Sequence, residues 1–115
     1  MNENAPSIAI YLADGFSDRQ VLREVLRGVE EESIPYEVLS GEPDDAVLLA
    51  YSGAERSALE VGIGLDNRNS LAVHYRKLQP GNPLFLLDYT KEPGEVRNAG
   101  ANAARLVKNT PFKDN

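Results

Sequence analysis

The chain has 115 residues, of which 12 are Lys or Arg and 18 are Asp or Glu, so its formal net charge is −6. This length fits one domain around a single core, and the acidic balance repels a phosphate backbone, which excludes a nucleic-acid partner. The absence of cysteine excludes disulfides and thiolate metal sites, and apolar runs such as 84–87 are far shorter than the ~20 residues of a membrane span, so we expect a soluble protein.

The first half of the chain predicts two strand–helix units. Residues 7–12 form an apolar run that is typical of the buried first strand of an α/β sheet. A helix follows, because Ser17 and Gln20 have the spacing of a capping box, and Pro35 ends it near Glu32. The further elements expected in this half are a strand at 36–39, a turn at 41–44 and a helix at 45–53.

The second half predicts a hairpin in place of a further parallel crossover. The connection 66–69 follows a strand at 59–65 and is shorter than the dozen or more residues that a parallel crossover needs. The next strand, at 71–75, is therefore expected to return antiparallel. The remaining elements are a loop at 77–83, a strand at 84–88 and a helix from Pro93 to Lys108.

The predicted order of elements is therefore βαβαβββα. Repeats, low-complexity tracts and linkers are absent from the sequence. We expect a single domain across residues 1–115, with flexible tails at 1–6 and 109–115.

Three residues that follow predicted strands allow two interpretations. Asp14 and Asp66 follow the first and third strands and Lys91 follows the fifth, which resembles the acidic pocket and lysine of a phosphate-accepting receiver domain. The hairpin replaces a helical crossover that such a domain requires, and the usual acidic pair after the first strand is reduced to one Asp. Turn-forming aspartates are the favoured interpretation, and a receiver-like or small-ligand-binding α/β module is the alternative.

The sequence lacks the common nucleotide-binding and catalytic patterns. Gly62 and Gly64 alternate along the third strand, but Asn67 stands where a dinucleotide fingerprint needs a third glycine. Two glycines on one face instead let a helix or a partner lie close to the sheet. His74 is the only histidine and has no Cys or Ser-centred elbow beside it, so we expect no enzyme and favour a structural role, with the polar end of its hairpin meeting another chain.

Three acidic residues, Glu30, Glu31 and Glu32, stand at the end of the first helix. The unsatisfied carbonyls of a helix end already concentrate negative potential, so each exposed acid there costs about 0.3–1 kcal/mol. One interpretation is an ordinary solvated helix end. The other is that a cation from elsewhere, a metal or a partner's Lys or Arg, completes the site.

The last helix has a thin side and a polar line. Ala99 and Gly100 belong to a side of small residues that lets a neighbouring backbone approach closely, and the expected neighbour is the sheet. Asn98, Asn102 and Arg105 form a separate line. This line offers directional hydrogen bonds to another subunit, or it is an ordinary solvated stripe.

Three segments of the chain resemble a known family. They are "REVLRGVEEESIPY", "LAVHYRKLQPGNPLF" and "RNAGANAARLVKNTPF". Over nearly its whole length the chain resembles the small subunit of the reactivating factor for coenzyme B12-dependent diol and glycerol dehydratases. The resemblance implies a three-layer α/β/α domain of the anticodon-binding-domain-like type, with a mixed five-stranded sheet whose fourth strand is antiparallel. A subunit of the dehydratase itself shares this fold and is the alternative.

The same resemblance implies a function. Similar small subunits pair with a large, Hsp70-like ATPase subunit, usually as two of each, in a chaperone-like complex. The complex exchanges subunits with an inactivated dehydratase, so that damaged cobalamin leaves and intact coenzyme enters. This chain is then expected to be non-catalytic, with ATP hydrolysis on the large partner, and to be cytoplasmic, in association with a bacterial microcompartment.

The resemblance also implies site residues. Glu31 matches a family glutamate that helps to hold a divalent cation, Mg or Ca, at the boundary with the large subunit, while no cofactor is expected on this chain alone. The residues expected at the partner interface are Asn98, Gly100, Asn102, Arg105 and His74. The chain departs from the family pattern at Ser33 and at 99–102, which leaves a diol or a glycerol dehydratase open as the target.

Overall fold

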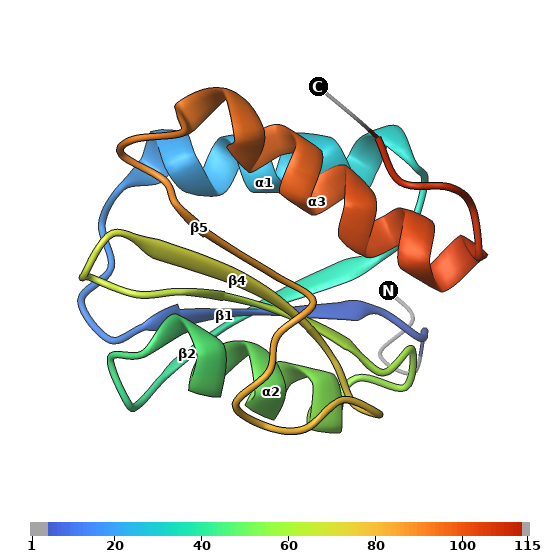
Figure 1. The fold of residues 1–115 in the computed structure, drawn as a ribbon, viewed down its shortest axis with the longest axis horizontal. Helices are drawn as coiled ribbons and strands as arrows, with labels where there is room; N and C mark the ends of the chain where they lie inside the picture. The colour runs from blue at the N-terminus through green and yellow to red at the C-terminus, as the bar shows by residue number, and fades with distance from the viewer. Residues whose placement is uncertain (1–4, 114–115) are drawn as a thin grey trace.

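The computed structural model describes residues 5–113, which form five strands and three helices in the predicted order (Figure 1). The strands are β1 (Ile8–Ala13), β2 (Tyr36–Gly41), β3 (Val61–Leu65), β4 (Ser70–Tyr75) and β5 (Phe85–Asp88). The helices are α1 (Arg19–Glu31), α2 (Ala46–Arg56) and α3 (Pro93–Lys108). Within residues 5–113, no helix is both long enough and apolar enough to cross a membrane.

The strands form one mixed sheet in the order β2-β1-β3-β4-β5. β1 is parallel to β2 and β3, whereas β4 is antiparallel to both β3 and β5. The β3–β4 connection is a tight hairpin in which the Asp66 N–H donates to the Ser70 carbonyl at 3.1 Å. Helices α1 and α3 cover one face of the sheet and α2 covers the other (Figure 1). The predicted hairpin, antiparallel fourth strand and three-layer α/β/α architecture are therefore confirmed.

Aspartates are the N-cap residues of the first two helices. One carboxylate oxygen of Asp18 accepts the N–H of Val21 at 3.1 Å, and Asp45 accepts the N–H of Leu48 at the same distance. Each carboxylate thus satisfies an amide of the first turn that has no partner within the helix. The prediction that Ser17 caps α1 is wrong by one residue, since Asp18 occupies the N-cap position.

Helix α2 lies directly against the backbone of β3. A Cβ atom added to Gly62 would lie 2.2 Å from the Ala50 carbonyl oxygen, and one added to Gly64 would lie 2.1 Å from that of Ala46. Real Cβ atoms do not approach backbone so closely, so only glycine fits at these two positions. The prediction that the two glycines let a helix lie close to the sheet is confirmed.

The thin side of α3 meets α1. A Cβ atom on Gly100 would lie 2.3 Å from the Val25 carbonyl oxygen, and one on Gly28 would lie 2.1 Å from that of Arg97. The expectation that Gly100 approaches the sheet is therefore wrong. Periodicity identified the side of α3 that allows close packing, but the neighbour is α1, which carries its own glycine at the crossing.

After α3 the chain reverses and runs back along the helix. Asn109 has the left-handed φ of 56°, and its N–H and that of Thr110 donate to carbonyls in the last turn of α3. We call residues 109–113 the C-terminal strap. The flexibility predicted for 1–6 and 109–115 stays a prediction, and residues 1–4 and 114–115 of those tails lie outside the described range.

Candidate functional site

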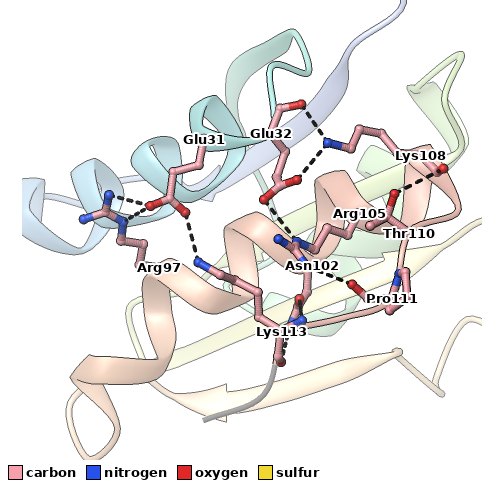
Figure 2. A network of polar contacts seen from close by, with 9 residues as sticks. All are labelled: Glu31, Glu32, Arg97, Asn102, Arg105, Lys108, Thr110, Pro111 and Lys113. Carbon is pink, nitrogen blue, oxygen red and sulfur yellow. Dashed lines mark hydrogen bonds and ion pairs between the residues drawn. The ribbon is translucent and has the colours of Figure 1, made fainter.

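Acidic residues at the end of α1 meet basic residues of α3 and the strap (Figure 2). Glu31 binds two cations: its Oε2 accepts Arg97 Nε–H at 2.8 Å, and its Oε1 lies 3.4 Å from Lys113 Nζ. Arg97 Nη2 also reaches Oε2, at 2.5 Å, so the guanidinium holds one carboxylate oxygen with two nitrogens. Both oxygens of Glu31 therefore have a cationic partner within this chain.

Glu32 is held more tightly than Glu31. Its Oε2 accepts Arg105 Nε–H at 3.0 Å, and its Oε1 accepts from Lys108 Nζ at 2.8 Å. Lys108 Nζ also donates to the Glu32 backbone carbonyl at 3.3 Å. The Glu32 side chain is only 10% exposed. The third acid, Glu30, accepts a hydrogen bond from the Tyr36 hydroxyl at 3.1 Å.

These cations make the two carboxylates more acidic than usual. The hydrogen bond from Lys108, followed by the Arg105 contact, lowers the pKa of Glu32 despite partial desolvation. For Glu31, desolvation raises the pKa, but the hydrogen bonds and charges of Arg97 and Lys113 together outweigh it and lower the pKa overall. The positive charge that compensates this acidic helix end is thus supplied by basic side chains of the chain itself. In the isolated chain, Glu31 and Glu32 are therefore neither simply solvated nor dependent on a cation from elsewhere.

A divalent metal site does not fit the described residues on their own. Mg²⁺ and Ca²⁺ require several oxygen ligands, and residues 5–113 contain no group of three or more His, Cys, Asp or Glu side chains that could hold a metal. Glu31 offers one carboxylate, which is already paired with Arg97 and Lys113. Among the residues that the structure describes, Glu31 is therefore not part of a side-chain group that could hold such a metal.

The polar line of α3 divides between the strap and a groove. Asn102 Oδ1 accepts the Lys113 N–H at 2.6 Å, and Asn102 Nδ2 donates to the Lys113 carbonyl at 3.4 Å (Figure 2). Arg105 Nη1 donates to the Pro111 carbonyl at 3.0 Å. Asn98 is half-buried and lines a groove between α3 and β5. Asn102 and Arg105 therefore bind the strap within the chain.

Two of the predicted interface residues are buried inside the chain. Gly100 lies against α1, and His74 is 0% exposed. The Tyr75 N–H donates to His74 Nδ1 at 3.0 Å, and His74 Nε2 donates to the Pro80 carbonyl at 2.9 Å, since a carbonyl oxygen only accepts. Both residues therefore have a structural role within the chain, which for His74 is to fix the end of β4, and their place at a partner interface stays a prediction.

Asp14 and Asp66, the aspartates of the receiver-like interpretation, make hydrogen bonds that stabilise the fold. Asp66 is 3% exposed and accepts three backbone N–H groups, those of Ala46, Arg68 and Ser70, at 2.8 to 2.9 Å. Its carboxylate thereby joins the start of α2 to the β3–β4 hairpin. Asp14 is exposed, and its backbone carbonyl accepts from Asn67. A turn-forming role for Asp66 is confirmed.

A family model described as dehydratase medium subunit matches residues 5–113. The chain belongs to this family. It is 44% identical over 113 residues to the diol dehydratase-reactivating factor small subunit of Klebsiella michiganensis, with 98% of this chain and 88% of that protein covered. It is 42% identical to the propanediol dehydratase-reactivating factor small subunit of Salmonella typhimurium, with 98% and 95% covered.

Solved structures of similar chains have the same fold. The structure of a diol dehydratase-reactivating factor complexed with ADP and Mg²⁺ contains a chain that is 45% identical, with a TM-score of 0.86 and coverage of 96% of this chain and 99% of that chain. A glycerol dehydratase reactivase contains a chain with 28% identity, a TM-score of 0.89 and coverage of 95% and 97%. Within the dehydratase medium subunit family, the resemblance to small subunits of reactivating factors is therefore confirmed.

The basic partners of Glu31 and Glu32 are functional-site residues that the sequence did not reveal. Arg97 and Lys113 hold Glu31, and Lys108 helps to hold Glu32. The signal available in the sequence was the spacing of Arg97, Arg105 and Lys108 along one helix, which places basic groups at intervals of eight and three residues. That spacing indicates a basic side of α3, but it does not say that the end of α1 lies against it.

Proposed function

We propose that this chain is the non-catalytic small subunit of a diol or glycerol dehydratase-reactivating factor. The observation that carries the proposal is the 44% identity over 98% of the chain to a reactivating-factor small subunit, together with the TM-score of 0.86 to a chain of such a factor. The structural roles of three polar residues support a non-catalytic subunit. Asp66, His74 and Glu32 hold the fold together and leave little for catalysis.

The proposed partner is a large subunit with an Hsp70-like ATPase fold, with two large and two small subunits in the complex. The large subunit would bind the nucleotide, in line with the ADP and Mg²⁺ in the related factor and with the missing phosphate loop in this sequence. The complex would exchange subunits with an inactivated dehydratase to release damaged cobalamin. The proposed setting is the cytoplasm, in association with a bacterial microcompartment.

The proposed contact surface is the end of α1 together with the polar line of α3. It contains Glu31, Asn98, Asn102 and Arg105. Glu31 is the proposed contribution of this chain to a divalent cation at the boundary, with the other ligands coming from the large subunit. The 30% exposure of its side chain supports access from outside.

Co-elution with the large subunit from the same organism tests the proposal. The purified chain and that subunit are mixed and passed over a sizing column without nucleotide, with ADP and with ATP. We expect a joint peak in at least one nucleotide state. Independent elution of the two chains in every state would overturn the proposed function.

The role of Glu31 is tested by Glu31→Ala, with Glu55→Ala as the matched control. Both residues are exposed helical glutamates, but Glu55 lies on α2, on the opposite face of the sheet. We expect Glu31→Ala to weaken the association with the large subunit and Glu55→Ala to leave it unchanged. Equal association of both variants would remove Glu31 from the contact surface.

A second candidate function is a subunit of the dehydratase itself, which the description of the family model names but which the similar reactivating-factor subunits do not favour. The two candidates differ in the large chain that they capture. When the chain is offered the large subunit of the reactivating factor and that of the dehydratase in equal amounts, a reactivase subunit selects the former in the absence of damaged enzyme. Exclusive capture of the dehydratase chain would favour the second candidate.

A further inference from the structure

The C-terminal strap, residues 109–113, covers part of the proposed contact surface. It meets Asn102 and Arg105 through hydrogen bonds and Glu31 through the ammonium group of Lys113 (Figure 2). Its last described residue, Lys113, is one of the residues that line the groove between α3 and β5. Three of the four proposed contact residues are therefore bound to the strap in the isolated chain.

Most of the strap is recognised through its main chain. The Asn102 amide pairs with both the N–H and the carbonyl of Lys113, as an adjacent strand would, and Arg105 binds the carbonyl of Pro111. One side chain adds selectivity in the groove, since the ring of Phe112 meets the ring of Phe85 edge to face, with centroids 5.1 Å apart. Any other extended segment with an aromatic side chain could make the same contacts. Its backbone N–H and carbonyl groups would bind Asn102 and Arg105, and its ring would pack on Phe85.

Displacement of the C-terminal strap is favourable only if another segment takes its place against α3. Asn102 is 7% exposed with the strap in place, and displacement of the strap removes two hydrogen bonds from its amide, which a replacement segment restores. The side-chain contacts of the strap are more open, because Phe112 is 40% exposed and the Lys113 ion pair is long, at 3.4 Å. The strap therefore has the properties of an exchangeable occupant and not of core structure.

We propose that the C-terminal strap competes, within the chain, with an extended segment of the large subunit. On association, that segment takes the place of residues 111–113 against Asn102, Arg105 and Phe85. Lys113 leaves Glu31 in the same step, so the carboxylate becomes available at the boundary between the chains. This inference rests on the proposed function, because its occupant is the large subunit of a reactivating factor.

The first test removes most of the C-terminal strap. A chain that ends at Thr110 loses residues 111–115 but keeps the two amides that donate to the last turn of α3. We expect its association rate with the large subunit to rise about fivefold, as the binding-competent state becomes fully populated. An unchanged or lower rate, in a chain whose thermal unfolding is still cooperative, would overturn the proposal.

The second test fixes the C-terminal strap in place by a covalent link. It tests the proposal even if the shortened chain fails to fold. The chain has no cysteine, so in the double variant Phe85→Cys and Phe112→Cys a cleavable cross-linker that reacts with two thiols can join only these two positions within the chain. We expect the cross-linked variant to associate at least about tenfold more slowly than the same variant after the linker is cleaved, which is its matched control. Equal rates for the linked and cleaved forms would overturn the proposal.

The outcomes separate this proposal from the proposed function. If the wild-type chain associates with the large subunit and neither variant changes the rate, the strap is not a competitor, although the subunit assignment stands. If no form of the chain associates, the proposed function fails and the inference fails with it.

Discussion

The α2 face and the α1/α3 face of the sheet are closed by different kinds of contact. On the α2 face, helix backbone lies directly on β3, because Gly62 and Gly64 leave no side chain between them. On the other face, α1 and α3 cross each other at Gly28 and Gly100. Beyond that crossing, the end of α1 is joined to α3 and the strap by ion pairs.

The difference shows which part of the molecule can change partners without unfolding. Main-chain contacts at a glycine have no substitute, because no side chain fits between the two backbones. The ion pairs of Glu31 are partly exposed, and an exposed pair contributes only about 0–1 kcal/mol, so its carboxylate can exchange one cation for another. We therefore expect variants at the glycine contacts to affect the fold and variants in the acidic cluster to affect association.

The largest expected effect is that of Gly62→Ala on the α2 face. The added methyl would lie 2.2 Å from the Ala50 carbonyl oxygen and 2.4 Å from the Ala54 nitrogen, both of which are backbone atoms that cannot rotate away. We expect α2 to be pushed off the sheet and the free energy of unfolding to fall by at least about 3 kcal/mol. Urea unfolding followed by circular dichroism measures the change.

Gly94→Ala is the matched control for that substitution. Gly94 lies in the first turn of α3, and a Cβ atom there would have nothing within 4 Å. The free energy of unfolding should stay the same or rise by up to about 1 kcal/mol, because alanine favours the helix. A loss of less than about 1 kcal/mol for Gly62→Ala would show that α2 does not rest on the β3 backbone.

Much of the fold could be predicted because its signals are local. Pro93 marked the first residue of α3, and the short connection at 66–69 required the hairpin. The neighbour of Gly100 could not be predicted in the same way. Helical periodicity shows that one side of α3 is thin, but two surfaces, the sheet and α1, were available to pack against it.

The candidate site was predictable only in its acidic half. Glu31 and Glu32 are adjacent in sequence and stand at a helix end, where their charge is unfavourable, so the sequence alone marks them as candidate site residues. Their partners lie far along the chain: Arg97 is 66 residues from Glu31 and Lys113 is 82 residues from it. Pairing over such distances follows from the packing of α3 on α1, which no local pattern encodes.

A smaller effect is expected for Asp66→Ala, which tests whether the α2 face also depends on a polar clamp. The substitution removes the acceptor of three backbone N–H groups, including that of Ala46 at the start of α2. We expect a loss of about 2 kcal/mol in the free energy of unfolding, measured by urea titration. Asp14→Ala is the control and should have little effect, because the bond from Asn67 goes to the Asp14 backbone.

The same pair of variants tests the receiver-like alternative. Mg²⁺ is added to the wild-type chain and the thermal midpoint is recorded. We expect no shift, because the carboxylate of Asp66 is already bound to backbone amides. A rise in the wild-type midpoint that disappears in both Asp14→Ala and Asp66→Ala would restore a metal-dependent pocket at the ends of β1 and β3.

The smallest effect is expected on the other face, for Glu32→Gln. Lys108 and Arg105 lower the pKa of Glu32 in the folded chain below its usual value of 4.5. The unfolded chain therefore binds a proton first as the pH falls, so the stability from this group is complete above about pH 4.5 and is lost as the pH falls through the folded pKa. At pH 7 the substitution should cost about 0.5–1 kcal/mol, measured by urea unfolding.

The pH profile of that loss distinguishes an ion pair from simple packing. The difference between wild type and Glu32→Gln should shrink towards zero below the folded pKa and also in high salt. A loss that is constant from pH 7 to pH 3 would mean that shape, and not charge, holds Glu32 against α3. In that case the end of α1 would be fixed in the same way as the glycine contacts, and it could not serve as the exchangeable region.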